Sequence, residues 1–459
     1  MDVRVEKLAE KMRSEGLPEI AIEAFVHSAD FVANGGETLI READIEAVDS
    51  VPVYGELANF AEKGQAVLGK TVVIKLNGGL GTSMGLSKAK SLLPVRDGLS
   101  FLDVIVRQVL HQQKTQKVEL PLVLMNSYRT QSDSLAVLDR YPKLAGTLPV
   151  DFLQHKVPRI LKESFSPVQW PEDESLEWCP PGHGDLYIAM ASSGMLEALI
   201  HRGYRYCFVS NADNLGAVLD PSILGWMASE KLPFVMEVAS RTEADKKGGH
   251  LARNAEGDLM LREVAQCPEA DRDAFQDIQK HKFFNTNNLW LDLFALRDVL
   301  ASSAGFNLPV MCNEKPVSAH DADSPRCYQL ETAMGAAISM FQGSKAVEVP
   351  RSRFAPVKTS NDLLMIWSDA YEVTEDHRVV PVDAAAQAKR VVDLDPAYFG
   401  KIDDLMARFP EGAPSLAKCE RLVVIGDHQF ESDIEVVGSV ELSNTGGEPV
   451  TIQAGTVLD

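Results

Sequence analysis

The chain has 459 residues, of which 45% are hydrophobic and 24% charged, and its formal net charge is −21. This composition is ordinary for a globular protein, so it excludes disorder, and the length predicts two or three domains. The acidic balance argues against a nucleic-acid partner, because binding the phosphate backbone requires a basic surface. No apolar run approaches the ~20 residues that span a bilayer. The first residues carry charges in place of a signal sequence, and the six cysteines form no CxxC pair. We therefore expect a cytoplasmic protein without a membrane segment, a zinc site or disulfides.

Residues 1–66 are predicted to be helical, because apolar residues recur there at three- and four-residue spacing with interruptions at Gly16 and Pro18. No chemistry is expected in this segment. We interpret it as a structural layer packed on a sheet.

Residues 71–91 read as an apolar strand that ends in a glycine-rich loop followed by lysines. The loop residues are Gly78, Gly79, Gly81, Gly85, Lys88 and Lys90. Glycine lets backbone N–H groups approach an anion closely, and a nearby lysine adds a full charge. The spacing fits neither the Walker loop nor the GxGxxG dinucleotide fingerprint. A purely structural turn is the alternative, but a nucleotide-phosphate loop at a strand end fits these residues better.

From residue 71 to about 300, short apolar strands alternate with amphipathic helical stretches. This alternation predicts βαβ units and a parallel or mixed sheet with helices on both faces. Residues 329–342 have a helical periodicity as well.

The tail has a different period. Apolar residues recur every six positions, and the interval returns after a polar insertion, at Val424, Phe430, Val436, Leu442, Ile452 and Leu458. A six-residue recurrence favours a few coils of a β-helix, although a short β-meander accounts for the same residues nearly as well.

A candidate metal ligand is Asp213, which follows the apolar strand that ends near Val209. A carboxylate in that place points toward the ligand crevice of an α/β sheet, where Mg²⁺ takes oxygen ligands. Seen alone, the aspartate is more often a cap of a turn.

The string LNGGLGTSMG, with a lysine soon after, resembles the signature of the eukaryotic-type UTP-glucose-1-phosphate uridylyltransferase family (UDP-glucose pyrophosphorylases). Related UDP-N-acetylhexosamine pyrophosphorylases have Ala at the position of Asn77 and Arg-Leu at 83–84. Further strings match the family at 180–185, 208–214, 284–290 and 351–362. The resemblance implies a Rossmann-like nucleotidyltransferase domain over 67–375, preceded by the helical segment 1–66 and followed by a left-handed β-helix-like domain over 376–459.

The resemblance also implies roles for individual residues. Asp213 holds Mg²⁺, Lys90 and Lys358 act on the phosphates as catalytic residues, and Gln154 reads the uracil edge. Leu76, Asn77, Gly78, Gly79, Gly182 and Asn211 contact the nucleotide. His183, Asn287, Gly248 and Gly249 lie toward the sugar phosphate, together with Gly78, Gly79 and Asn211. The family commonly has Gly-Pro before its first lysine, whereas this chain has Lys88-Ala89, so the division of charge between Lys88 and Lys90 stays open.

The function implied is Mg²⁺-dependent transfer of the uridylyl group of UTP to glucose 1-phosphate, giving UDP-glucose and pyrophosphate. Such a reaction needs cations and backbone donors that align two polyanions, and no protein nucleophile. A broader UDP-sugar or UDP-N-acetylhexosamine pyrophosphorylase is the first alternative. A catalytically silent nucleotide-sugar sensor is the second, although Asp213, Lys90 and Lys358 are all present. The tail could also mediate a homo-oligomer.

Overall fold

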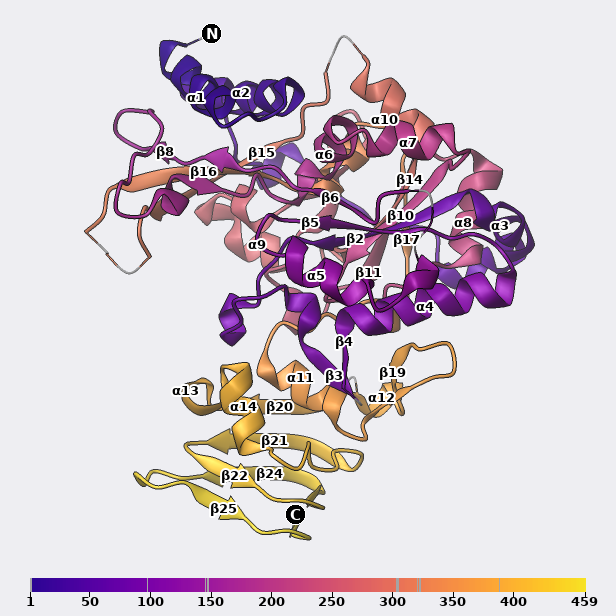
Figure 1. The fold of residues 1–459 in the computed structure, drawn as a ribbon, viewed down its shortest axis with the longest axis vertical. Helices are drawn as coiled ribbons and strands as arrows, with labels where there is room; N and C mark the ends of the chain where they lie inside the picture. Colours follow the sequence, from indigo (N-terminus) through magenta and orange to yellow (C-terminus); the bar gives the residue numbers. More distant parts are fainter. Residues whose placement is uncertain are drawn as a thin grey trace.

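The structure, a computed structural model, is organised around a ten-stranded mixed sheet (Figure 1). It describes residues 2–96, 98–144, 146, 148–302, 305–319, 321, 323–387 and 389–459, without the side chains of 83 and 244. The sheet contains β1 (Glu46–Ala47), β2 (Thr71–Asn77), β5 (Leu122–Asn126), β6 (Asp151–Leu153), β10 (Tyr206–Asn211), β11 (Phe234–Ser240), β12 (His250–Arg253), β13 (Leu259–Arg262), β14 (Phe283–Asp292) and β17 (Lys345–Glu348).

Strands β10, β2, β5 and β6 run parallel to one another, so their carboxyl ends meet at one edge of the sheet. Strand β14 pairs antiparallel with both β10 and β11. The predicted mixed α/β sheet is therefore confirmed.

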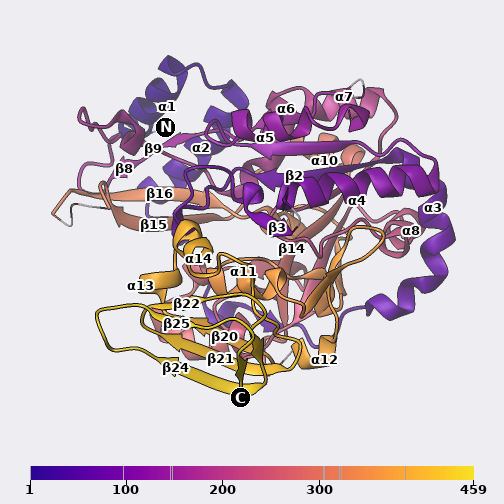
Figure 2. The same cartoon turned by 60° about the horizontal axis from the view of Figure 1, so that its bottom comes forward.

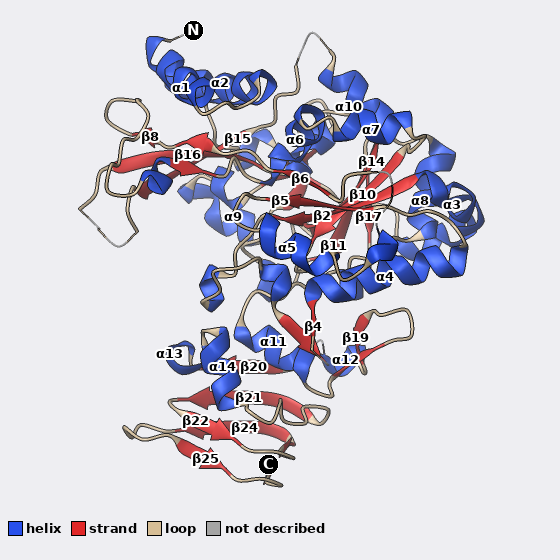
Figure 3. Ribbon diagram, in the orientation of Figure 1, coloured by secondary structure: helices blue, strands red, loops and turns tan. Residues whose placement is uncertain are grey.

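Helices cover both faces of the sheet, and its central strands are therefore buried on both sides (Figure 3). Val73 packs in the core that contains α4 and α8, whereas Val72 and Ile74 pack in the core of α6, α7 and α10. The helices of this part are α3 (Ala61–Val67), α4 (Phe101–Gln116), α5 (Gln131–Leu138), α6 (Leu186–Ser192), α7 (Met195–His201), α8 (Pro221–Glu230), α9 (Arg272–Gln276) and α10 (Leu293–Leu300).

The N-terminal segment is only partly helical. Helices α1 (Val3–Ser14) and α2 (Glu19–Ala33) are present, but residues 34–60 form 3-10 turns, β1 and irregular chain before α3 begins. Gly35, Gly36 and Pro52 interrupt the helical pattern, which explains the difference. The two helices bury residues such as Leu8 and Phe25 mainly against a separate three-stranded sheet, not against the central one.

The helical prediction for residues 329–342 was wrong, because the first part of this stretch belongs to that separate sheet. Residues 326–332 form β16 (Arg326–Thr332), which pairs with β15 (Val310–Pro316) and with β8 (Ile160–Leu161), and a 3-10 helix follows at Met334–Ser339. Strand pairing along seven residues of β15 overrides the helical spacing of this short apolar segment. Strands β7 (Val157–Pro158) and β9 (Trp178–Cys179) pair beside it.

The C-terminal strands stack on one another beyond α11 (Ser360–Trp367), at the end of the molecule that comes forward in Figure 2. The residues of the six-residue period pair in parallel register, Val424 with Leu442, Phe430 with Ile452 and Val436 with Leu458. A meander would pair its strands antiparallel. The elements here are β20 (Val391–Leu394), β21 (Cys419–Ile425), β22 (His428–Phe430), β23 (Glu435–Val436), β24 (Gly438–Ser443), β25 (Val450–Ile452), β26 (Val457–Leu458), α12 (Ala384–Gln387), α13 (Pro396–Phe399) and α14 (Ile402–Arg408).

Two small hairpins complete the fold. Strands β3 (Pro94–Arg96) and β4 (Leu99–Ser100) form one, and β18 (Tyr371–Val373) and β19 (Val379–Pro381) form the other. No helix within the described ranges is long and apolar enough to cross a membrane.

Candidate active site

A cavity of about 200 Å³ opens where the parallel strands β2, β5 and β10 end. Ligands of open α/β sheets bind at such carboxyl ends. The cavity is lined by Leu76, Asn77, Gly78, Gly79, Lys90, Ser91, Met125, Gln154, His183, Asn211, Ala212 and Asp213. The structure thus brings together most of the site residues predicted from the sequence, although they are spread along the chain from Leu76 to Asp213.

The glycine loop forms one wall of this cavity. A Cβ at Gly78 would lie 2.6 Å from Oε1 of Gln154, so a larger residue there would have to displace that amide. The Lys90 amide donates to the Gly79 carbonyl at 3.1 Å, and the Gly81 amide donates to the Lys88 carbonyl at 3.3 Å. These bonds fold the lysine segment back onto the loop.

The side chain of Asn77 does not face a ligand. Its amide donates to Asn126 Oδ1 and Ser134 Oγ, each at 2.7 Å, and its Oδ1 accepts from Ser91 Oγ at 2.5 Å. With the residue buried and its amide satisfied, Asn77 ties the end of β2 to the segment that carries Lys90. Only its backbone is available to a nucleotide.

Lys90 and Asp213 meet inside the cavity, where the ammonium Nζ lies 2.8 Å from carboxylate Oδ2. Lys88 is exposed, so the structure directs Lys90 and not Lys88 to this carboxylate. The other oxygen, Oδ1 of Asp213, is buried and has no hydrogen-bond partner within the described residues. A buried carboxylate oxygen is costly to leave unpaired, and it suits a hard cation.

The donor set therefore fits a Mg²⁺ ion held by one carboxylate and by substrate phosphates. No group of three His, Cys, Asp or Glu side chains that could hold a metal was found in the described parts of the chain. Mg²⁺ sites of phosphate-handling enzymes use one or two carboxylates plus phosphate oxygens, so they need no such cage.

Lys358 is exposed and stands outside the lining of the cavity. Its neighbour Val357 donates its amide to the carbonyl of Asp213 at 3.2 Å, which places Lys358 beside the metal-ligand candidate. Hydrogen bonds hold the turn that precedes Lys358. Arg353 donates twice to the fully buried Glu237, at 2.8 and 2.6 Å, and Asn214 accepts from the Ala355 amide at 3.0 Å.

Gln154 and the loop around Gly182 lie next to the glycine loop. Nε2 of Gln154 donates to the Gly182 carbonyl at 3.1 Å. Gly182 has a φ of +81°, and a Cβ there would lie 2.4 Å from the Thr332 carbonyl, so this position also requires glycine.

His183 follows in the same loop, and its Nδ1 accepts a hydrogen bond from the Met334 amide at 2.9 Å. Burial lowers the pKa of His183 to about 4, so the imidazole is neutral at pH 7. With Nδ1 accepting, the proton resides on Nε2, which is then available as a donor.

Of the residues predicted to lie toward the sugar, Asn287, Gly248 and Gly249 stand outside the lining of the cavity. Asn287 has a φ of +59° at a bulge in the pairing of β11 with β14, which lifts it out of the ladder. Its Oδ1 accepts from Asn285 at 2.8 Å. The Gly249 carbonyl accepts from the Asn285 amide at 3.0 Å, so the second predicted glycine adjoins the asparagines, with Gly248 preceding it in the chain.

Sequence reasoning missed several residues here. Ser91, Met125 and Ala212 line the cavity, and each is adjacent in sequence to a residue at a strand end or in the loop, which was the available signal. Glu263 was missed entirely. It lies against Gly249, where a Cβ would stand 2.4 Å from its Oε2, and burial raises its pKa to about 7.

A glycine loop, a lysine–carboxylate pair and oriented amides at the carboxyl ends of parallel strands define an α/β enzyme that handles a nucleotide. Comparisons with known proteins narrow this class. A family model described as UTP-glucose-1-phosphate uridylyltransferase matches residues 22–436.

The chain is 38% identical over 410 residues to the UTP-glucose-1-phosphate uridylyltransferase of Solanum tuberosum, an alignment covering 88% of this chain and 84% of that protein. It is also 38% identical over 413 residues to the enzyme of the same name from Saccharomyces cerevisiae, covering 90% of this chain and 81% of that one. A solved structure of a UDP-glucose pyrophosphorylase mutant from Leishmania major, in complex with UDP-glucose, is 43% identical with a TM-score of 0.92, covering 100% of this chain and 98% of that chain.

The chain belongs to the UTP-glucose-1-phosphate uridylyltransferase family, since the family model covers most of its length. The resemblance inferred from the glycine loop and the downstream strings is thereby confirmed.

Proposed function

We propose that this enzyme transfers the uridylyl group of UTP to α-D-glucose 1-phosphate and releases pyrophosphate. The observation that carries the proposal is the cavity at the ends of β2, β5 and β10, where the glycine loop, Lys90, Asp213 and Gln154 converge. Membership of the family and the likeness to a structure that holds UDP-glucose support the same reaction.

In this reaction a phosphate oxygen of glucose 1-phosphate attacks the α-phosphorus of UTP. A new P–O bond forms as the bond between the α-phosphorus and its bridging oxygen breaks, and that oxygen leaves with the pyrophosphate. Because the nucleophile belongs to the substrate, the protein acts by alignment and by electrostatic stabilisation. Lys90, already within the cavity, and Lys358, beside Asp213, supply positive charge to the phosphates.

We propose Mg²⁺ as the cofactor, with Asp213 as its protein ligand through the unpartnered Oδ1. When bound, the ion offsets charge on the phosphate oxygens of the two substrates. Lys90 pairs with the other carboxylate oxygen, Oδ2, at 2.8 Å, so Asp213 can serve the lysine and the ion through different oxygens.

At the nucleotide end, Gln154 is proposed to read uracil. The Gly182 carbonyl only accepts, so Nε2 of Gln154 must face it, and Oε1 is left to accept the N3–H of the base. Leu76 to Gly79, Gly182 and Asn211 contact the nucleotide through backbone and short side chains.

At the sugar end, Asn287, Gly248 and Gly249 are proposed to bind the hydroxyl groups, with His183 donating from Nε2 toward the sugar phosphate. Glu263 adds a carboxyl group next to Gly249. Amides and carboxylates pair well with sugar hydroxyls because they offer several acceptors in fixed geometry.

We further propose the domain division 1–66, 67–375 and 376–459, with the last domain a left-handed β-helix and a candidate surface for a homo-oligomer. The parallel pairing of its strands supports the assignment of a β-helix. A cytoplasmic location is proposed because the six cysteines are free thiols.

The test is pyrophosphate release from UTP with a panel of sugar 1-phosphates, with and without Mg²⁺. We expect turnover with glucose 1-phosphate that requires the ion. Equal or faster turnover with galactose or N-acetylhexosamine phosphates would replace this assignment by the broader pyrophosphorylase. Binding of UDP-glucose without any turnover in Mg²⁺ would refute the enzymatic assignment.

A further inference from the structure

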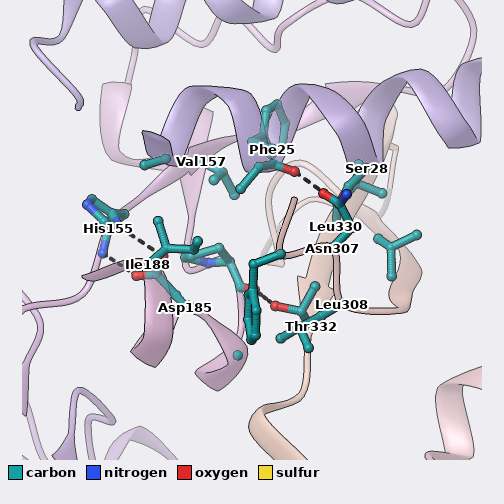
Figure 4. Close-up of a pocket in the computed structure, with 16 residues that line it drawn as sticks. Phe25, Ser28, His155, Val157, Asp185, Ile188, Asn307, Leu308, Leu330 and Thr332 are labelled. Carbon is teal, nitrogen blue, oxygen red and sulfur yellow. Dashed lines mark hydrogen bonds and ion pairs between the residues drawn. The ribbon is translucent and has the colours of Figure 1, made fainter. Parts of the chain in front are cut away.

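Behind the loop that carries Gly182, His155 and Asp185 face each other at one side of a cavity of about 60 Å³ between α2 and β16 (Figure 4). The carboxylate of Asp185 binds residue 155 twice, accepting from its backbone amide at 2.7 Å and from ring Nδ1 at 2.8 Å. The far ring nitrogen, Nε2, lies 3.0 Å from Ser192 Oγ. The side chains of His155 and Asp185 are only 9% and 6% exposed, so these bonds are shielded from water.

The carboxylate of Asp185 connects two separate segments. Asp185 ends a 3-10 turn, His183–Asp185, that continues directly into α6, and its own backbone is helical, with φ −60° and ψ −15°. Its side chain makes no bond to the first amides of that helix. The carboxylate instead accepts from residue 155, so it fixes the loop at Gly182 relative to the segment that carries Gln154.

Those two segments meet at Gln154. Gln154 precedes His155 in the chain, and its Nε2 donates to the Gly182 carbonyl at 3.1 Å. That same carbonyl accepts the Asp185 amide at 3.3 Å. Hydrogen bonds therefore link the Gln154 side chain, the loop at Gly182 and the Asp185 carboxylate into one ring of contacts.

We propose that Asp185 and His155 are positioning residues that fix the orientation of the Gln154 amide and thereby set the preference of the site for uracil over cytosine. This rests on the proposed role of Gln154. Uracil presents N3–H as a donor, whereas N3 of cytosine is an acceptor. A Gln154 amide free to rotate can pair with ring position 3 of either base, whereas an amide held with Oε1 toward that position accepts from N3–H of uracil and faces the acceptor N3 of cytosine.

The experiment measures kcat/KM for UTP and for CTP at saturating glucose 1-phosphate, in the wild type and in Asp185→Asn, His155→Gln, Gln154→Ala and the Asp185→Asn/Gln154→Ala double variant. The matched control is His281→Gln. His281, itself buried, also pairs with a carboxylate, the partly buried Glu42, over 2.8 Å, but it does not line the cavity.

We expect Asp185→Asn to lower the UTP/CTP ratio about tenfold, the scale of one hydrogen bond to a charged group. Gln154→Ala is expected to lower it at least as much, and the double variant no further, because both changes act through one amide. The control should keep the wild-type ratio, and thermal unfolding verifies that each variant is folded.

A wild-type ratio in Asp185→Asn, together with a reduced ratio in Gln154→Ala, overturns the positioning role while leaving Gln154 as the uracil reader. An equal loss of kcat/KM for both nucleotides in Asp185→Asn also overturns it, since that is a general structural effect. An unchanged ratio in Gln154→Ala removes the reader itself, and the positioning role with it. Should Asp185→Asn fail to fold, the ratio in His155→Gln decides on the same terms.

Discussion

Replacement of Gly78 by alanine tests the geometry of the nucleotide wall. The new Cβ would lie 2.6 Å from Oε1 of Gln154 and 3.7 Å from the Ser127 backbone nitrogen. Ordinary contact begins at 3.4 Å, so the amide must withdraw by the difference of 0.8 Å. Residue 78 is itself held, because its carbonyl accepts from Ser127 Oγ at 3.0 Å.

A displacement of that size breaks the 3.1 Å bond from Gln154 to the Gly182 carbonyl. Loss of one hydrogen bond removes about 1 kcal/mol, and a misdirected base contact about as much again. Together these predict a fall in kcat/KM for UTP of about 10- to 100-fold, since each 1.4 kcal/mol is about a factor of ten.

The assay is steady-state pyrophosphate release at varied UTP, with thermal unfolding of the free protein alongside. Gly447→Ala is the control, because a Cβ there meets nothing within 4 Å. We expect the control to match the wild type in both measurements. A Gly78→Ala enzyme with wild-type kcat/KM for UTP would refute the argument that the amide of Gln154 occupies this place in the working site.

Three further predictions follow from charge and burial. Lys358→Ala should lower kcat by roughly 10²- to 10³-fold with little change in thermal stability, as expected when an exposed lysine that stabilises developing charge is removed. His183→Asn should flatten the stability profile below pH 6.5. The folded pKa of His183 is about 4, against 6.5 for the free group, so the unfolded wild type binds the extra proton, and the free energy of unfolding falls as pH drops through that window. Glu263→Gln should be more stable than the wild type at pH 8 and similar to it at pH 5. The folded pKa of about 7 exceeds the ordinary glutamate pKa of 4.5, so the wild type loses stability as pH rises between them.

Each of these has a result that contradicts it. Wild-type turnover in Lys358→Ala would remove that residue from the mechanism. Chemical denaturation across pH 4 to 8 tests the other two, and slopes that match the wild type in His183→Asn or Glu263→Gln would show that these groups do not titrate in the folded state as their burial indicates.

The local sequence was sufficient to predict those elements whose conformation depends mainly on neighbouring residues. The apolar run of β2 followed by glycines fixes a strand and a loop whatever surrounds them, and the lysines after it had to lie close by. The six-residue recurrence of the tail likewise gave inward-facing residues that pair in register. The helical prediction for 329–342 was wrong because antiparallel pairing with the preceding strand, β15, outweighs a short helical pattern.

The sequence alone determined which residue types reach the end of each strand, and so the chemistry available there: lysine, carboxylate, amides and bare backbone. Only the tertiary structure decided how they are used. It placed Lys90 against Asp213, turned the side chain of Asn77 away from the ligand, and set Asp185 against His155. These contacts join segments that are far apart along the chain, and the sequence does not show that they meet. The packing of the sheet and its helices, and not backbone propensity, determines which side chains lie together.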